Sequence, residues 1–375
     1  MPAWVRAEPL PLDQAYSELR LLQPVLAATA ATADGRLALV ATVNLEGATL
    51  EEGELAPGNW GEGFVDRRHP HTWVHELLAV VATGDRGAPR PWALSLAAGK
   101  GFVPFGTDDP MNRPVLRYPV NHHLAQILER AVAAAGVRYG PAALELSLFN
   151  GDEPEQPSSW PNWDRFGDSW AARLTVAPGA GLEGQVSHAD VASPEHRGGA
   201  GPTQEKWSAS LRWAGRLGGG EGYALAEWAH TDEVEGIFAF ESALLEGEWR
   251  AGRWRPYARL ERTERPEEER VDPPFRSARP HLDNSIVGIT RWTVVTGGIG
   301  LTAFRRGGLA VEPLVEAAWS GVEAVGGGLF QPADWYGDDR LWSVTVAVGL
   351  RWAAPGPRHR MGRYGAVTTL AGPGH

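Results

Sequence analysis

The chain contains no cysteine, which excludes disulfides, thiolate metal sites and cysteine nucleophiles together. It also lacks any run that approaches the roughly 20 apolar residues of a membrane-spanning helix. A helical membrane protein is therefore excluded. The only other structure that can span a bilayer is a closed β-barrel, because a barrel pairs its backbone groups internally.

Lysine is almost absent, occurring only at Lys100 and Lys206, and the net charge is -11. Nucleic-acid binding needs a clustered cationic excess, which the sequence does not contain. The first 25 residues have no basic segment followed by an apolar one, so an export signal is not visible. Neither a G-x-S-x-G turn nor a phosphate-binding glycine loop occurs, and we expect no enzymatic activity and no cofactor.

Tryptophan, glycine and proline are abundant, with 17, 46 and 29 copies, which suits short strands, tight turns and aromatic residues at a membrane interface. From Gln126 onward, segments of about ten residues alternate between apolar and polar positions. In the segment 341–352 one face is apolar along its whole length and carries a tryptophan at each end: Trp342, Val344, Val346, Val348, Leu350 and Trp352. This pattern is typical of a lipid-facing strand.

The same alternation, with tryptophan near the end of the apolar face, recurs in the segments 169–176, 206–213, 243–250 and 254–261. We expect membrane-interface anchors at Trp170, Trp207, Trp213, Trp249, Trp254, Trp342 and Trp352. A soluble β-sandwich also alternates, but its tryptophans should lie in the middle of strands, inside the core. The position of tryptophan therefore favours the barrel.

The predicted fold is all-β, a single transmembrane antiparallel β-barrel of about sixteen strands, in a range of roughly 14 to 18. The barrel is expected over 17–352, with an N-terminal extension at 1–16 and a C-terminal extension at 353–375. Segments 284–295 and 297–305 are counted as two strands. Short joins predict periplasmic turns, and longer polar stretches predict external or inward-folded loops: 101–124, 151–167, 190–204, 266–281 and 326–339.

The stretch 92–188 resembles the phosphate-selective porin family of sixteen-stranded outer-membrane porins. The resemblance rests on a strand that runs into a Pro-Phe-Gly turn, on a Leu-Glu-Arg sequence, on a hairpin that opens at Gly136 and Val137, and on the strand after it. The residues concerned are Ala98 to Gly106, Leu128, Glu129, Arg130, Leu148 to Gly151, Ala171 to Leu174 and Pro178. It implies a location in the bacterial outer membrane and a pore. The lysine cluster of a phosphate-selective pore is missing, so phosphate selectivity is not carried over.

The expected function is passive diffusion of ions or small solutes through a channel lined by charges that tune passage. The predicted lining residues are Arg130, Arg173, Arg212, Glu246, Glu248, Arg255, Arg259, Glu261, Arg291 and Arg351. The same side chains would serve equally as a ladder of salt bridges that stiffens the wall. Expected partners are outer-membrane lipid, the transported solutes or ions, the barrel-assembly machinery and further copies of the chain in a homotrimer.

Two alternatives stay open. Histidines at two places would suit a transition metal if the barrel brought them together: His69, His71, His75, His122 and His123. However, the helical spacing of a zinc protease is absent, and polar loop or lumen-lining roles fit the same residues. The other alternative is a soluble all-β binding protein without membrane contact.

Overall fold

The computed structural model describes residues 1–8, 16–45, 48, 72–83, 91–107, 110–120, 122–154, 157–268, 286–326, 331–353 and 360–367. Within these ranges, eighteen strands form one antiparallel sheet. The first nine are β1 (Pro2–Glu8), β2 (Tyr16–Leu21), β3 (Val25–Ala31), β4 (Leu37–Asn44), β5 (Val74–Ala82), β6 (Trp92–Gly101), β7 (Arg130–Tyr139), β8 (Ala142–Phe149) and β9 (Ser169–Gly179).

The second nine strands are longer on average, and the described part of the chain adds a short helix between the last two. They are β10 (Leu182–Ala192), β11 (Thr203–Leu217), β12 (Gly220–Glu233), β13 (Phe238–Arg250), β14 (Trp254–Glu268), β15 (Ile286–Leu301), β16 (Phe304–Arg306), β17 (Leu309–Val325) and β18 (Arg340–Trp352), with α1 (Pro332–Tyr336). No helix in the described ranges is long and apolar enough to cross a membrane.

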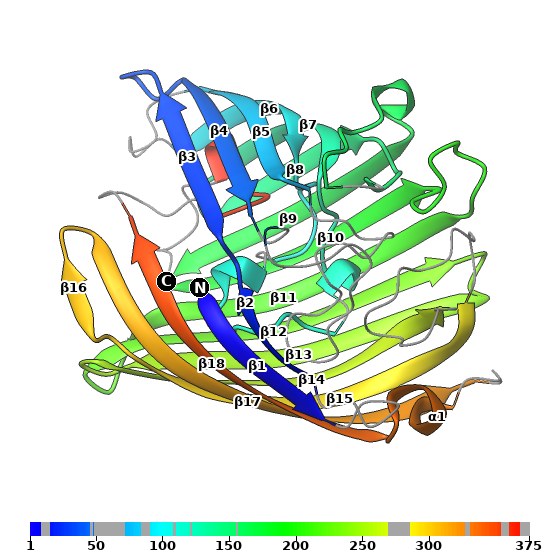
Figure 1. The fold of residues 1–375 in the computed structure, drawn as a ribbon. Helices are drawn as coiled ribbons and strands as arrows, with labels where there is room; N and C mark the ends of the chain where they lie inside the picture. Colours follow the sequence, from blue (N-terminus) through cyan, green and yellow to red (C-terminus); the bar gives the residue numbers. More distant parts are fainter. Residues whose placement is uncertain are drawn as a thin grey trace.

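The strands curve round into a barrel (Figure 1). Neighbours in the sequence pair from β3 to β15, β15 and β16 both pair with β17, and β17 pairs with β18. β18 then pairs with β1, and β1 with β2. The two ends of this hydrogen-bonded ladder, β2 and β3, are consecutive in the chain and are joined by residues 22–24. Within the described residues, β2 and β3 are linked by the chain itself and not by a ladder of hydrogen bonds.

The expected strand number is confirmed, although two errors in the expectation offset each other. β15 and β16 both pair with β17, so they are two parts of one interrupted strand, and β2 and β3 form another. Counted in this way, the eighteen strands give sixteen. The predicted break at residue 296 does not exist, because β15 runs through it. In its place the expected N-terminal extension supplies β1, which pairs with Trp342–Ala347 of β18.

A glycine pair in β15 explains the false turn. Gly297 and Gly298 resemble turn residues in sequence, but Gly298 pairs with Tyr257 of β14. A Cβ atom at Gly298 would lie 2.3 Å from Cζ of the Tyr257 ring. The strand therefore needs a glycine where the ring of its neighbour crosses it.

The alternation in sequence becomes the two faces of the wall. In β18, Trp342, Val346 and Leu350 are exposed on the outside, whereas Thr345 and Ala347 are buried on the inside. Connections also divide by length. Short turns, such as 140–141, 180–181 and 218–219, lie at one end, here called the short-turn end. Long connections, such as 102–129 and 150–168, lie at the other, as expected for a barrel of this type.

Candidate functional site in the lumen

The described residues between β6 and β7, 102–107, 110–120 and 122–129, enter the lumen and are here called the inner loop. The two limbs of the loop are joined where the Val103 amide donates to the Ile127 carbonyl at 3.0 Å. Gly106 has a φ of +68°, and a Cβ atom there would lie 1.7 Å from the Ala125 carbonyl oxygen. Only glycine fits this close approach. The Pro-Phe-Gly turn seen in the sequence therefore folds the inner loop back on itself.

The middle of the inner loop packs against the opposite wall. Leu116 and Tyr118 belong to one buried apolar cluster with Ala3 of β1. Val120 belongs to another cluster with Trp292 of β15. Since the loop starts from β6, these contacts show that it crosses the lumen rather than lining one side of it.

Carboxylates of the wall hold the backbone of the inner loop. Glu316 of β17 accepts hydrogen bonds from the backbone amides of Leu116 and Arg117, at 2.8 and 3.0 Å. Glu261 of β14 accepts one from the Val120 amide at 2.9 Å. All three bonds are buried, and a charged acceptor makes them stronger than ordinary amide bonds. The fixed position of the loop thus depends on acidic residues of the wall.

Side chains of the inner loop are paired to the wall as well. Arg113 donates to both carboxylate oxygens of Glu227 in β12, at 3.2 and 2.7 Å, and its Nε lies 4.0 Å from Glu246. Burial acts to lower the pKa of Arg113, but the carboxylates of Glu227 and Glu246 outweigh it and raise this pKa above its usual value. Arg113 therefore stays charged in a site that water hardly reaches.

Arginines of the wall reach back to the inner loop. Arg259 donates to the Arg117 carbonyl at 2.6 Å. Arg255 donates to the Pro114 carbonyl at 3.2 Å and to Glu248 at 2.9 Å. Each of these wall arginines thus binds the loop backbone while it is paired with a carboxylate of the wall, Arg255 with Glu248 and Arg259 with Glu246.

Eight of the ten predicted lining residues lie on the inner face and are buried: Arg130, Arg173, Arg212, Glu246, Glu248, Arg255, Arg259 and Glu261. Arg259 is 1% exposed and Glu248 6% exposed. In a wide open pore these side chains would be wet, whereas here the inner loop covers Arg255 and Arg259, and Gly151 and Glu153 contact Arg130. Arg351 is half-buried near the end of β18.

The inward placement expected for Arg291 is corrected by the structure. Arg291 lies on the outer face of β15, where its Nη2 is 2.6 Å from Glu264. The neighbouring Trp292 takes the inward position and is 2% exposed. A tryptophan beside an arginine in a strand allows either register from sequence alone, and packing against the inner loop decides it.

The described histidines that the metal-binding alternative requires make different contacts. Nδ1 of His75 lies 2.5 Å from Glu129, which also accepts a hydrogen bond from the Thr72 amide. The rings of His122 and His123 pack against each other, with centroids 4.2 Å apart. His69 and His71 lie outside the described residues. Where the structure is described, no group of three or more side chains is arranged to hold a metal.

A second segment inside the lumen was not expected from the sequence. Residues 360–366, here called the C-terminal segment, lie inside the barrel beyond β18 and are buried. The Tyr364 hydroxyl accepts a hydrogen bond from the Phe102 amide at 3.0 Å. Burial, together with the Glu76 carboxylate, raises the pKa of Tyr364 well above its usual value. Two arginines and a tyrosine in a glycine-rich tail carry no strand periodicity, so the pattern gave no signal.

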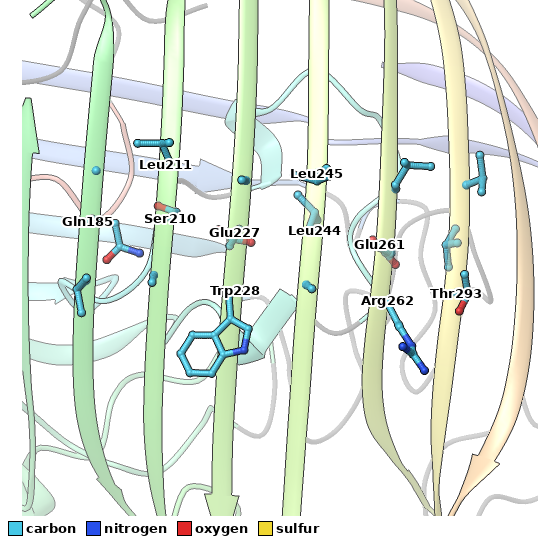
Figure 2. A pocket seen from close by; sticks show the side chains of 18 of the residues that line it. Gln185, Ser210, Leu211, Glu227, Trp228, Leu244, Leu245, Glu261, Arg262 and Thr293 are labelled. Atoms are coloured by element: carbon cyan, nitrogen blue, oxygen red, sulfur yellow. The ribbon is translucent and has the colours of Figure 1, made fainter.

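The outer face carries the predicted anchors. Trp170, Trp207, Trp249, Trp254, Trp342 and Trp352 are exposed there, and Trp213 is half-buried. An open apolar groove of about 880 Å³ runs across strands β9 to β15 (Figure 2). Leucines such as Leu211 and Leu245 border small residues such as Ala226 and Ala243. A continuous apolar surface of this kind is what lipid requires.

No protein-family model matches the chain, and no curated protein matches it. Solved structures do. The anion-selective porin from Comamonas acidovorans is 10% identical with a TM-score of 0.50, covering 94% of this chain and 97% of that one. A loop L8 deletion mutant of OmpT from Vibrio cholerae is 10% identical, with a TM-score of 0.48 and coverages of 94% and 96%. OmpF of Salmonella typhi in complex with daunomycin is 9% identical, with a TM-score of 0.48 and coverages of 93% and 95%.

At these identities the likeness concerns the course of the backbone alone. It extends over nearly the full length of this chain and of the Comamonas protein. Together with the sixteen-strand wall and the outward tryptophans, it identifies the architecture. The chain has the fold of an outer-membrane porin.

Proposed function

We propose that the protein is an outer-membrane channel for passive diffusion of ions or small solutes. The observation that supports this most directly is the contrast between the two faces of the wall. The outer face exposes leucine, valine and tryptophan, whereas the inner face concentrates arginine and glutamate. A barrel in lipid is the arrangement in which both faces are favourable.

The proposed passage is narrow, because the inner loop and the C-terminal segment occupy part of the lumen. Charges such as Arg113 and Glu227 would set the electric field along it. The passage would therefore discriminate by charge and size together. We propose neither the solute nor phosphate selectivity, since the resemblance to the phosphate-selective porin family lacks the lysine cluster of such a pore.

Conductance in a planar lipid bilayer tests this proposal. Purified full-length protein is added on one side, and single steps of current are recorded under a salt gradient. We expect discrete conductance steps and a reversal potential that reports charge preference. Protein that is folded and inserted but never conducts, even when the anchor of the inner loop is weakened by Glu316→Gln, would contradict the channel.

Location and assembly are part of the same proposal. An outer-membrane barrel inserts into outer-membrane lipid, and we propose that the barrel-assembly machinery reads the end of β18 at Trp352. We also propose a homotrimer, which chemical cross-linking in native membranes would test. The metal-binding and soluble alternatives receive no added support, because His75 is paired with Glu129 and the tryptophans of the outer face are not covered by a second sheet in the described residues.

A further inference from the structure

The C-terminal segment, residues 360–366, fills a place on the inner wall between β5 and β10. β18 ends with Trp352 at the short-turn end, and the described residues from Arg360 onward lie inside the barrel. Arg360 and Met361 are each 5% exposed, Arg363 is 2% exposed and Tyr364 is 3% exposed. A terminal segment that is buried this deeply must be held by specific contacts, because ordering it costs conformational entropy.

One carboxylate of the wall receives both arginines of the segment. Arg360 donates to the two oxygens of Glu183 in β10, from Nη1 at 2.8 Å and from Nη2 at 2.9 Å. Arg363 donates to Glu183 from Nη2 at 3.1 Å and to the Thr175 hydroxyl of β9 at 2.9 Å. The forked pair with Arg360 is the geometry in which a guanidinium group is recognised most specifically.

The other half of the segment is held through its backbone and its tyrosine. Arg173 of β9 donates to the Gly362 carbonyl at 2.6 Å while it is paired with Glu145 at 2.6 Å. Glu76 of β5 accepts a hydrogen bond from the Gly362 amide at 3.3 Å and one from the Tyr364 hydroxyl at 3.0 Å. These bonds fix the segment along its length, from β10 to β5.

The wall is shaped to receive the segment. A Cβ atom at Gly101 would lie 2.7 Å from the Tyr364 hydroxyl oxygen. Gly365 has a φ of +60°, and a Cβ atom there would lie 2.3 Å from Cβ of Ser95 in β6. Both contacts are closer than any side chain permits. Steric fit and hydrogen bonding therefore select the same position for the segment.

The segment supplies positive charge to a side of the lumen that is rich in buried carboxylates. The wall contributes the carboxylates of Glu76, Glu145 and Glu183 and the guanidinium of Arg173. The segment adds two positive charges to this group, beside Arg212 of β11, which is buried and stands opposite Glu183 in the sheet. Without it, buried Glu183 would lose the forked pair with Arg360 and the bond from Arg363, at a cost in free energy that another guanidinium group in the same place would offset.

The segment can also dissociate from the wall without disrupting the sheet. None of the residues 360–367 belongs to a strand, so its release breaks no ladder hydrogen bond of the sheet. We propose that the site around Glu183 is a guanidinium-binding site of the lumen, that its resident occupant is the C-terminal segment, and that a guanidinium-bearing solute displaces this segment. Displacement of the segment would also widen the passage, and this part of the proposal rests on the proposed channel function.

A single introduced thiol tests the displacement, because the natural chain contains no cysteine. Met361→Cys places the thiol in the buried segment, and Arg340→Cys places one at the exposed start of β18 as the matched control. The full-length variants in detergent are treated with a thiol-reactive dye, and the rate of labelling is followed with increasing methylguanidinium. Methylammonium at the same concentrations controls for charge and ionic strength.

We expect methylguanidinium to speed labelling of the Met361→Cys variant in a saturable way, methylammonium to have little effect, and the Arg340→Cys variant to label rapidly throughout. Adding Glu183→Gln should raise labelling of the buried thiol by about tenfold or more without any solute, since it breaks a buried ion pair. Equal labelling with both cations, or no increase in the Glu183→Gln background, would overturn the proposal.

A second variant keeps the test informative where Glu183→Gln prevents folding. Arg360→Lys with Arg363→Lys retains both charges but removes the forked geometry, and labelling should then rise several-fold in a barrel whose circular dichroism is unchanged. If the double lysine variant labels at the same rate as the Met361→Cys protein that keeps both arginines, recognition of the guanidinium group is contradicted. The labelling experiment and the conductance experiment can fail independently. If the labelling results hold but no variant conducts in a bilayer, the channel function fails and the binding site stands. If the barrel conducts but methylguanidinium displaces nothing, the binding site fails and the channel function stands.

Discussion

The anchor of the inner loop on Glu316 gives the sharpest prediction about the lumen. Two backbone amides, those of Leu116 and Arg117, donate to the two oxygens of this one carboxylate. In Glu316→Gln the shape is kept, but one oxygen is replaced by an NH₂ group that cannot accept. One buried amide then faces another donor. We expect the loop to be released part of the time while the barrel itself stays folded.

The size of the effect follows from the bond that is lost. A hydrogen bond to a charged group, or a buried donor left without a partner, is worth about 1–3 kcal/mol. Taking about 2 kcal/mol, and tenfold for each 1.4 kcal/mol, the undocked population of the loop rises roughly 30-fold. A change of this size should be visible both in labelling of a loop thiol and in current through the channel.

The assay uses Val115→Cys, whose parent side chain is fully buried in the inner loop. Its labelling rate is compared in the Glu316→Gln background and in a Glu323→Gln background, and the conductance of each is recorded. Glu323 lies on the same strand, but its side chain is 61% exposed and 3.9 Å from Arg291, so its loss should be nearly neutral. If the two backgrounds label and conduct alike, the Glu316 carboxylate does not hold the inner loop.

Two further predictions concern the wall. Gly298→Ala would place a methyl group 2.3 Å from Cζ of the Tyr257 ring, so we expect the free energy of unfolding, measured in urea from lipid vesicles, to fall by about 1–3 kcal/mol. Gly297→Ala, which has open space at its Cβ, should change this free energy little. Equal losses in the two variants would refute the steric role of Gly298. Replacing the exposed Trp342 with Phe should reduce the fraction of tryptophan fluorescence quenched by brominated lipid, and replacing buried Trp292 should not. Quenching that falls equally in both variants would mean that the two faces are assigned wrongly.

Much of the wall could be predicted from sequence, because each strand carries its own evidence. In β18 the alternation of Trp342 to Trp352 predicts which face points outward, whatever the neighbouring strands are. The expectation from sequence is wrong where local residues resemble those of another element. Gly297 and Gly298 resemble a turn but provide room for a ring, and β1 is too short to show an apolar face bounded by tryptophan.

The contents of the lumen could be predicted from the sequence only in part. The sequence indicated that residues 101–124 form a loop and allowed it to fold inward. It also placed most of the charged residues on the inner face. What it could not supply is the partner of each charge, since inward arginines pair with carboxylates or with carbonyl groups of the loop according to where the loop runs.

The sequence by itself therefore determined the class of fold, the approximate strand number and the outer face, because these depend on a period of two within ten or so residues. Tertiary structure decided whether the lumen is open. Arg113 meets Glu227 across 114 positions, and Tyr364 meets Glu76 across 288. Contacts between such distant residues exist only after the wall has curved and two segments have entered it, and no local pattern encodes them.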